Sequence, residues 1–381
     1  MGVAVLNDPV RARRVLVVNA GSSSVKLSVL EGTGGDDKLV TSETVPAPGG
    51  QVDQSVLRAI VDKAAPIDAV GHRIVHGGSE FTQPVLIDAD VVRRLQDLTD
   101  LAPLHQPKSL QGLDWVGRAL PDVPAVACFD TAFHATIPAE AHTYALPSQW
   151  RLRWDLRRYG FHGLSHSYAS RRAADLAGPG APLRRVVTCH LGAGASLCAI
   201  RDGVSVDTTM GFTPLEGLVM ATRSGSVDPG LLVWLEEHVG MPPAELASTL
   251  EHRSGLFGLT GTADMREVLA SEAAGDPTAA LAMGVYLHRL RSCTASMAAA
   301  LGGVDALVFT GGVGERSVPV RLRAAQGLEF LGVSIDPAAN EGARGDCEVT
   351  GAGASARTFV IEAREDLEIA RGVRQVLAAT N

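Results

Sequence analysis

The amino-acid sequence predicts an α/β protein that contains one structural unit twice. The segment from Arg13 to Gly32 (RRVLVVNAGSSSVKLSVLEG) and the segment from Arg184 to Gly203 (RRVVTCHLGAGASLCAIRDG) share one pattern, in which an apolar strand runs into a glycine-containing turn and a second strand. At one constant offset, two arginines, a valine and two glycines of the first segment match the second. The rest of the sequence alternates between strand-like and helix-like stretches, which is typical of sheets covered by helices.

Each matching segment is expected to form a β-hairpin whose tip is mostly backbone. Small residues at such a tip let backbone N–H groups approach an anion, and Ser22, Ser23, Ser24 and Ser196 add hydroxyl donors. An ordinary hairpin is the better interpretation of either tip alone, because short glycine motifs are common. The duplication, with Lys26 just beyond the first tip, favours two tips that hold a polyphosphate between two domains.

A third glycine-rich turn follows a legible helix and strand in the second half. Thr278 to Leu301 is expected to be helical, because apolar residues recur at helical spacing and Gly302-Gly303 ends the segment. The strand DALVFT then leads into GGVGERS, at the carboxyl edge of a sheet, where open α/β folds bind ligands. We assign this turn to a nucleotide, although a simple strand-to-helix turn fits the local sequence equally well.

Composition bounds the class of protein. The 381 residues are about twice the usual size of one domain, and with 46% hydrophobic and 20% charged residues the chain can bury substantial cores. A net charge of −8 argues against nonspecific binding to nucleic acid or to anionic membranes. No apolar stretch is long enough to span a bilayer, and the first residues lack a signal-peptide core, so we expect a cytoplasmic protein. The five cysteines form no CxxC motif and are interpreted as small structural side chains.

Four polar clusters lie between these elements. They are GHRIVHGG with Arg73, ACFDTAFHATIP with Asp130, RRYGFHGLSH with His162, and GFTPLEGLVMATRSGSVDPG with Arg223. Any one of these side chains, taken alone, is more often a capped or solvated residue than a residue that takes part in a reaction. Together they supply what phosphoryl transfer requires, since the protein there mainly positions reactants and neutralises charge. Two arginines are most useful when the acceptor is itself an anion such as a carboxylate.

Nine motifs in order carry a resemblance to a known family. They are NAGSSSVK, GHRIVHGG, APLHQP, FDTAFHATIP, RRYGFHGLSHSY, HLGAGAS, MGFTPLEGLVMATRSG, FTGGVGERS and EDLEIAR. From about Val15 to about Arg371 the chain resembles the acetate kinase family of the acetate and sugar kinase, Hsp70 and actin superfamily. The resemblance implies two duplicated actin-like (ribonuclease H-like) domains with a nucleotide cleft between them. We expect the first domain over residues 1–150, joined by a C-terminal helix at about 367–381, and the second over residues 151–366.

The resemblance also implies the reaction and its cofactor. ATP and acetate would give ADP and acetyl phosphate, reversibly and by direct in-line transfer, with Mg²⁺ or, in its place, Mn²⁺. Asn19 and Glu365 would organise the metal, whose preference is for hard oxygen ligands. A homodimer is implied too, with no nucleic-acid or membrane partner.

The catalytic roles follow from the same matching motifs. Arg73 and Arg223 would hold the carboxylate and the moving phosphoryl group, and His162 would donate a hydrogen bond to that group. Asp130 would orient an arginine or handle a proton. We expect the domains to close, because in-line transfer needs close contact and exclusion of water.

The nucleotide and acyl contacts are implied by the same motifs. The residues assigned to ATP are Lys26, His190, Leu191, Gly192, Ala193, Gly194, Asp264, Met265, Arg266, Gly311, Gly312, Val313, Gly314, Glu315 and Arg316. The residues assigned to the acyl pocket are Val75, Leu104, Phe161 and Pro214. Because one methylene changes pocket binding by only ~1–3 kcal/mol, we expect propionate to be a weaker substrate and not a forbidden one.

Three other functions remain open from the sequence. A propionate or other short-chain carboxylate kinase would share the chemistry and differ only in the pocket. An actin-like or Hsp70-like ATPase would share the duplicated turns, but it has no evident use for Arg73, Arg223 and His162. A catalytically silent regulator is disfavoured because the other polar positions are intact.

Three departures from the family pattern bear on activity. Ala193 stands where most members have Asn in HLGNGS, Arg316 follows GGVGE where members read GGIGEN, and Ser226 stands where many read SGDIDP. We therefore expect activity with altered nucleotide affinity or rate.

The substitution Ala193→Asn tests the first departure. A lost hydrogen bond to a charged group costs roughly 1.5–3 kcal/mol if nothing replaces it, so the asparagine is expected to raise kcat or to lower the KM for nucleotide. Steady-state kinetics of the two proteins measure this. Identical constants would mean that position 193 does not matter.

Overall fold

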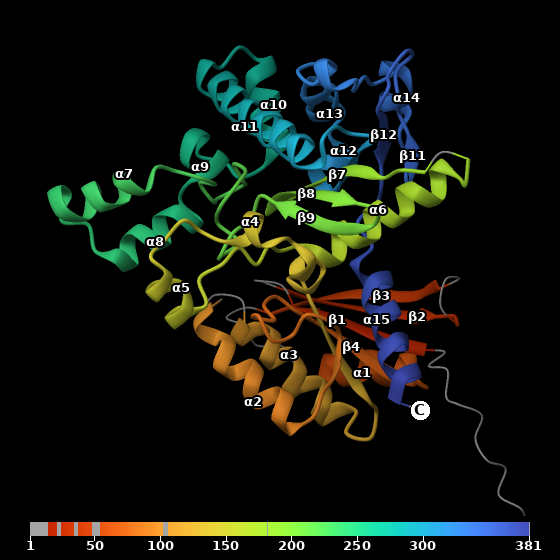
Figure 1. Cartoon of the computed structure of the whole chain (residues 1–381). Coiled ribbons are helices and arrows are strands. Elements are labelled where there is room, and N and C mark those ends of the chain that lie inside the picture. Colours follow the sequence, from red (N-terminus) through yellow and green to blue (C-terminus); the bar gives the residue numbers. More distant parts are fainter. Residues whose placement is uncertain are drawn as a thin grey trace, which may run out of the picture. The chain divides into compact units, whose positions relative to one another are not determined.

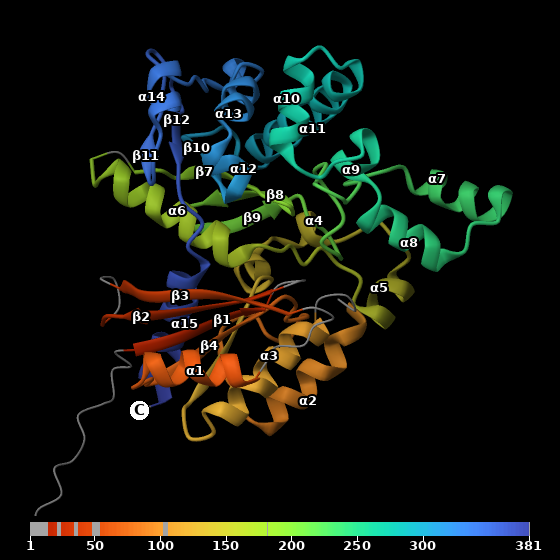
Figure 2. The same cartoon turned by 180° about the vertical axis from the view of Figure 1, so that it is seen from behind.

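A computed structural model describes residues 14–20, 24–33, 37–47, 54–101, 106–180 and 182–380. The chain forms two compact units, each a sheet flanked by helices (Figures 1 and 2). One unit runs to Phe133 and resumes at Arg364, and the other is His134–Ala363. The chain therefore leaves the first unit, builds the second and returns to the first.

In the part of the first unit that the structure describes, six strands are flanked by helices. The strands are β1 (Arg14–Ala20), β2 (Ser24–Glu31), β3 (Lys38–Pro46), β4 (Ala69–Ile74), β5 (Val85–Leu86) and β6 (Ala125–Phe129). The helices are α1 (Gln54–Ala64), α2 (Ala89–Asp97), the 3-10 turn η2 (Leu98–Leu101), α3 (Gln106–Ala119) and α15 (Glu365–Thr380), and the 3-10 turn η3 (Ala132–Thr136) lies at the boundary.

The described residues of the second unit also form six strands. The strands are β7 (Arg185–Leu191), β8 (Ala195–Arg201), β9 (Val204–Thr208), β10 (Ala306–Thr310), β11 (Cys347–Glu348) and β12 (Arg357–Val360). The helices are α4 (Ala139–His142), α5 (Ser148–Trp154), α6 (Gly163–Ala177), α7 (Pro229–Trp234), the π-helical turn η4 (Leu235–Val239), α8 (Pro243–His252), α9 (Gly255–Thr260), α10 (Met265–Ala273), α11 (Pro277–Leu301), α12 (Gly311–Arg316), α13 (Val318–Ala325), the 3-10 turn η5 (Glu329–Leu331) and α14 (Pro337–Gly342).

The two sheets have the same topology. Their strand orders are β3-β2-β1-β4-β6-β5 and, read in the same direction, β9-β8-β7-β10-β12-β11. In each, the first strand pairs antiparallel with the second and parallel with the fourth, and a short antiparallel strand closes the far edge. The predicted duplication and both predicted hairpins are confirmed.

Side-chain alternation decides which helix covers which face of the first sheet. Leu16 and Val18 of β1 belong to a core cluster that contains residues of α1 and α3. The opposite face lies against α15, because a Cβ built on Gly71 in β4 would be 2.5 Å from Ile369 Cγ2. Asn19 and Arg73 have the alternation of this second face, so both lie on the α15 side of the sheet.

The predicted helix at 278–301 is confirmed as α11, which ends at Gly302 in the left-handed conformation. The face that it buries differs in part from the predicted spacing. Met283, Tyr286, Leu287 and Leu290 are buried, whereas Leu281 is 64% exposed. Apolar residues surround much of this helix, so their spacing alone could not define one buried face.

The division between the units falls earlier than residue 150. The segment that carries α4 and α5 belongs to the second unit, where Thr143 forms an isolated β-bridge with Arg157. Tyr144 donates its hydroxyl to Glu216 Oε2 at 2.7 Å and accepts from the Phe212 backbone. These polar contacts of a loop segment leave no signal in the hydrophobic pattern of the sequence.

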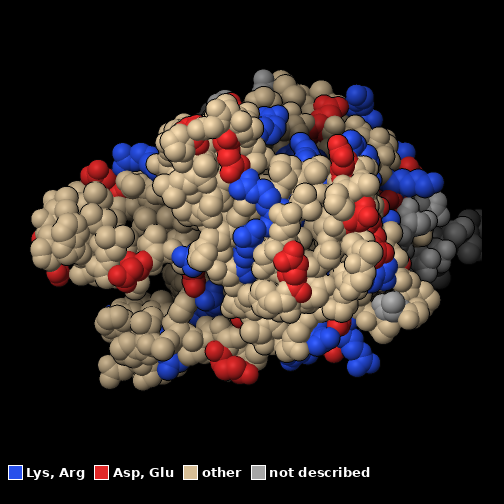
Figure 3. All heavy atoms as spheres, turned by 90° about the horizontal axis from the view of Figure 1, so that it is seen from above, with Lys and Arg blue, Asp and Glu red and all other residues tan. Residues whose placement is uncertain are grey.

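Charge and hydropathy of the described residues give two further facts. None of their helices is both long and apolar enough to cross a membrane. On the face drawn in Figure 3, Lys and Arg side chains are interspersed with Asp and Glu side chains. On that face the net charge of −8 is therefore not gathered into one acidic patch.

The contact between β4 and α15 predicts that Gly71→Ala destabilises the first unit. Its methyl group would overlap Ile369 and Val373, and overpacking costs about 1–3 kcal/mol. The matched control is Gly117→Ala on the exposed side of α3, where a Cβ meets nothing within 4 Å and helix propensity favours alanine. Thermal unfolding should show a lower Tm for Gly71→Ala only. Equal midpoints would contradict this packing.

Candidate functional site

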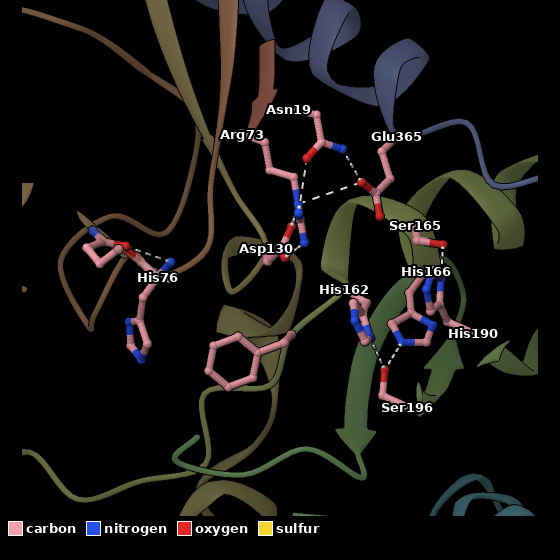
Figure 4. Close-up of polar contacts among 12 residues, drawn as sticks. Asn19, Arg73, His76, Asp130, His162, Ser165, His166, His190, Ser196 and Glu365 are labelled. Atoms are coloured by element: carbon pink, nitrogen blue, oxygen red, sulfur yellow. Dashed lines mark hydrogen bonds and ion pairs between the residues drawn. The ribbon is translucent and has the colours of Figure 1, made fainter. Parts of the chain in front are cut away.

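One polar cluster of the first unit collects a side chain from each of four elements. Asn19 ends β1, Arg73 lies in β4, Asp130 follows β6 and Glu365 begins α15 (Figure 4). The strands β1, β4 and β6 are parallel, so their carboxyl ends meet at one sheet edge, which is where open α/β folds bind ligands. Residues predicted from separate motifs are thus brought together by topology.

Arg73 is the centre of this cluster. Its Nε and Nη2 donate to the two carboxylate oxygens of Asp130 at 2.9 and 2.5 Å. Its Nη1 donates to Asn19 Oδ1 at 3.1 Å, and its Nε lies 3.6 Å from Glu365 Oε2. Asn19 Nδ2 donates to the same Glu365 oxygen at 3.0 Å. The planar guanidinium is therefore fixed on three sides.

Burial and charge act in opposite directions on this ion pair. Burial raises the pKa of Asp130 to about 6, against the stabilising effect of Arg73. Burial also disfavours the charged form of Arg73, but Asp130 and Glu365 outweigh it and raise the pKa of Arg73. At neutral pH the cluster therefore holds a permanent cation bound to an ionised carboxylate that is 1% exposed.

Lys26 lies beside this cluster on the neighbouring strand. It pairs directly with Asn19 across the β1–β2 hairpin, so both side chains project from one face of the ribbon. Its side chain is exposed. The hairpin tip with Ser22 and Ser23 lies outside the described residues, as does Leu104 of the predicted acyl pocket.

A second polar cluster surrounds the β7–β8 hairpin tip in the other unit. The His162 and His190 rings stack with centroids 4.3 Å apart, and their Nδ1 atoms contact Ser196 Oγ at 2.9 Å and Ser165 Oγ at 2.8 Å respectively. Ser196 is fully buried, so the prediction that its hydroxyl serves the hairpin tip is wrong. Its hydroxyl is engaged by imidazoles because the residue alternates toward α6.

Arg223 meets the same hairpin tip. A Cβ built on Gly194 would lie 2.8 Å from Arg223 Nη2 and 3.3 Å from His162 Nε2, so a guanidinium and an imidazole approach the tip from one side. Arg223 Nη1 donates to the Pro214 carbonyl at 2.6 Å. Burial lowers the pKa of Arg223, with Glu251 opposing, but an arginine stays charged at neutral pH. The arrangement offers an anion a cation and neighbouring donors.

A cavity of about 780 Å³ opens beside this tip in the second unit. Its lining residues are Gly192, Ala193, Ala221, Leu256, Ala263, Asp264, Met265, Arg266, Leu269, Tyr286, Gly312, Val313, Arg316, Ser317 and Pro319. Eight of these were assigned to ATP from the sequence. The size and the mostly apolar lining with a polar rim suit a nucleotide-sized ligand.

Four other residues assigned to ATP in this unit, Leu191, Gly311, Gly314 and Glu315, lie at the end of β7 and in α12. Leu191 and Gly314 are buried. Gly311 has a φ of 77°, and a Cβ built on it would lie 2.8 Å from the Leu191 carbonyl oxygen, so both its conformation and its surroundings require glycine. Glu315 Oε1 accepts from the Ala363 backbone at 2.9 Å. The turn at GGVGE is one and a half turns of helix, α12, that directly follows β10.

Residues that the sequence did not single out also shape the second cluster. His166 bonds to both Thr188 and Ser196, and Tyr286 forms a wall of the cavity. His166 stood inside the motif RRYGFHGLSHSY, four residues after His162, which is one helical turn. The spacing of one helical turn from His162 could therefore have indicated that His166 lies near it.

The structure also gives the burial of the acyl-pocket residues that it describes and the surroundings of Ser226 and Ala193, two positions that depart from the family pattern. Val75 in the first unit and Phe161 in the second are buried hydrophobic side chains, and Pro214 is buried as well. Ser226 Oγ accepts from the Gly217 backbone at 3.0 Å, so the serine ties together the two ends of the loop that contains Arg223. Ala193 is exposed at the rim of the cavity.

The crowding at the tip predicts that Gly194→Ala weakens anion binding. The new methyl group would displace Arg223 and His162, so titration calorimetry with inorganic phosphate should show affinity reduced by about tenfold, the equivalent of one hydrogen bond or slightly more. Gly284→Ala in α11, where a Cβ meets nothing within 4 Å, is the control. Unchanged phosphate affinity would show that these groups do not bind the anion.

Comparison with known proteins agrees with this geometry. Residues 50–371 match the model of the acetokinase family. The acetate kinase of Clavibacter michiganensis subsp. michiganensis is 45% identical over 394 residues, covering 96% of this chain and 99% of the relative. That of Synechocystis sp. is 40% identical over 402 residues, covering 94% and 96%.

Solved structures give the same result. The crystal structure of Porphyromonas gingivalis acetate kinase is 36% identical, with a TM-score of 0.84 over 96% of this chain and 100% of that one. A propionate kinase from Francisella tularensis subsp. tularensis is 34% identical, with a TM-score of 0.85 over 95% and 99%. Fold, sequence and site residues therefore agree, and the chain belongs to the acetokinase family.

Proposed function

We propose that this chain transfers the γ-phosphoryl group of ATP to acetate, reversibly, giving ADP and acetyl phosphate. Its activity is that of an acetate kinase, a phosphotransferase whose acceptor is a carboxyl group. The observation that carries the proposal is the presence, in a chain of this family, of two half-buried arginines held in place by hydrogen bonds, Arg73 and Arg223. Two fixed guanidiniums suit a reaction that brings two anions together.

Arg73 and Arg223 would hold the carboxylate and the transferred phosphoryl group. Asp130 gives both carboxylate oxygens to Arg73, which supports a role in orienting that arginine and not in proton transfer. His162 would donate to the phosphoryl oxygen from the Nε2 atom that lies near Gly194. No covalent enzyme intermediate is needed, because positioned reactants and neutralised charge are sufficient for in-line transfer.

A magnesium ion fits the donor set of the first cluster. Glu365 supplies a carboxylate and Asn19 an amide oxygen, both hard ligands. Within the described residues, Glu365 Oε1 makes no hydrogen bond and so is available to a cation, directly or through water. Mg²⁺ needs few protein ligands when water and phosphate complete its shell. When bound, the metal neutralises charge on the phosphate oxygens; Mn²⁺ has the same ligand preferences.

The nucleotide would occupy the 780 Å³ cavity of the second unit. The base and ribose would lie against the apolar wall that includes Leu256, Met265 and Tyr286, with the phosphates toward Gly192 at the hairpin tip. Lys26 would contact the phosphates. Arg316 lines this cavity and would add a cation where the family pattern has asparagine.

Propionate is the second candidate acceptor. The Francisella tularensis propionate kinase structure resembles this chain as closely as the acetate kinase structures do. The acyl wall of Val75, Leu104, Phe161 and Pro214 would distinguish the two acids by about one methylene of binding, ~1–3 kcal/mol. Acetate is therefore proposed as the better substrate and propionate as a slower one.

A cytoplasmic homodimer is part of the same proposal. All five cysteines are unpaired, which suits a reducing compartment. Large apolar side chains of α7 and η4 in the second unit are exposed, among them Trp234 and Val239. Such side chains, gathered on neighbouring helical turns, are typical of a surface that pairs with another chain.

Hydroxylamine trapping tests the reaction directly. With Mg²⁺, ATP and a series of short carboxylates, the purified protein should form acyl hydroxamate in step with ADP, fastest with acetate. Arg223→Leu should lower kcat by about 10²–10³, as expected for loss of a transition-state donor, whereas Arg184→Leu, an exposed arginine of the same unit, should not. ATP turnover independent of carboxylate, or full activity of Arg223→Leu, would overturn the proposal.

A further inference from the structure

The loop from Gly211 to Gly217 carries the backbone carbonyl that accepts from Arg223. The loop is neither helix nor strand, and it contains a turn at Pro214 and Leu215. Arg223 Nη1 donates to the Pro214 carbonyl at 2.6 Å. The direction of the guanidinium therefore depends on where this turn lies. Because an irregular loop lacks the hydrogen bonds of a helix or a sheet, other groups must fix it in place.

One hydroxyl group joins the two sides of this turn. Tyr144 donates its hydroxyl hydrogen to Glu216 Oε2 at 2.7 Å and accepts from the Phe212 backbone N–H at 2.9 Å. Phe212 stands two residues before Pro214 and Glu216 stands two residues after it. Burial and the hydrogen bond to Glu216 raise the pKa of Tyr144, so the hydroxyl keeps its hydrogen at neutral pH. A single side chain therefore closes the turn across its base.

Arg158 joins the start of the same loop to Glu216. Its Nη1 donates to the backbone carbonyls of Thr209 and Met210 at 3.3 and 3.0 Å, and its Nη2 donates to Glu216 Oε1 at 2.8 Å. The Arg158 side chain is 16% exposed and that of Glu216 is 36% exposed, so water screens the attraction between their charges in part. The contribution of Arg158 is therefore mainly geometric, because its planar fork reaches three acceptors that a lysine could not reach together.

The loop has space for these groups because of Gly211. A Cβ built on this glycine would overlap Glu216 Oε2 and the Tyr144 hydroxyl. The Gly211 carbonyl accepts from the backbone N–H groups of Tyr159 and Gly160, which directly follow Arg158 in the sequence. The carboxylate and the phenol thus lie against bare backbone, and only glycine permits so close an approach.

The backbone of Arg223 is anchored apart from this loop. Its carbonyl accepts from the Met220 N–H at 3.1 Å, and the next residue, Ser224, donates to the Leu250 carbonyl at 3.0 Å. Among the described residues, the Arg223 side chain hydrogen-bonds only to the Pro214 carbonyl. Movement of the turn would therefore redirect the guanidinium without unfolding the segment that carries it.

We propose that Tyr144, Glu216 and Arg158 form a clamp that holds Arg223 in the direction that phosphoryl transfer requires, with the Pro214 carbonyl as the link. The three are positioning residues, since each acts through the turn and not on a substrate. The inference rests on the proposed function, because Arg223 is taken to neutralise charge on the phosphoryl group in transfer.

Tyr144→Phe removes only the hydroxyl from the clamp. Loss of its two hydrogen bonds should free the turn and lower kcat by about tenfold, with the KM for acetate and for ATP each changed by less than about twofold. Tyr159→Phe is the matched control, because its hydroxyl bonds to Asp155 at the end of α5, and it should keep the wild-type kcat. Equal kcat values for the two variants overturn the proposal.

A double-mutant cycle shows whether the clamp acts through Arg223. In the Arg223→Leu background no guanidinium is left to direct, so Tyr144→Phe should change kcat by less than about twofold. A merely structural defect would lower kcat by the same factor in both backgrounds, and that result overturns the proposal. If Tyr144→Phe does not fold, Glu216→Gln, which keeps one acceptor of the carboxylate, decides by the same cycle. If neither variant folds, the clamp serves stability and the proposal is overturned.

Chemical modification of arginine separates this inference from the proposed function. Phenylglyoxal reacts with accessible guanidinium groups, and peptide mass spectrometry reports its rate at Arg223, with the exposed Arg184 as internal reference. That rate should rise at least about threefold in Tyr144→Phe and stay unchanged in Tyr159→Phe. An unchanged rate in both overturns the proposal. A wild-type protein that forms no acyl phosphate would refute the function, while this rate would still decide the clamp.

Discussion

The ion pair between Arg73 and Asp130 is the interaction on which the first polar cluster depends. Asp130 is removed from water, so its carboxylate is stable as an ion only while the arginine pairs with it. Asn19 and Glu365 complete the surroundings of the guanidinium, which leaves it little freedom to turn. A substrate carboxylate would therefore meet a cation whose orientation has been fixed in advance, and preorganisation of this kind is what lowers the cost of binding two anions.

Duplication explains why the second cluster lies where it does. The offset that aligns the two hairpins places His190 of β7 at the position of Asn19 in β1, on the same face of the equivalent sheet. In the first sheet that face is covered by α15, which follows the last strand of the second unit. In the second it is covered by α6, which precedes β7 and supplies Ser165 and His166, with His162 just before its first residue. One sheet edge has thus been given amide and carboxylate chemistry and the other imidazole chemistry.

Much of this fold could be predicted from the sequence, and the contacts that could not be predicted depend on how distant parts of the chain come together. The hairpins, α11 and the turn after β10 depend on local periodicity and on glycine. Local segments such as RRVLVVNAGSSS and DALVFTGGVG were therefore sufficient to predict them. The partners of Arg73 come from positions 19, 130 and 365, which only the strand order brings together. The role of Ser196 depends on the face toward which one strand residue points, and a one-residue change of register would reverse it. Arg223 was singled out from its glycine-flanked loop, whereas its role toward the phosphoryl group came from the family resemblance and is a prediction.

Arg73 and Arg223 differ in how far neighbouring carboxylates already balance their positive charge. Arg73 lies against two carboxylates, so most of its charge is balanced before any ligand arrives. Among the described residues, Arg223 hydrogen-bonds only to a neutral carbonyl, and Glu251 acts on it through space alone. Its charge is therefore available to the phosphoryl group, where negative charge must be stabilised during transfer.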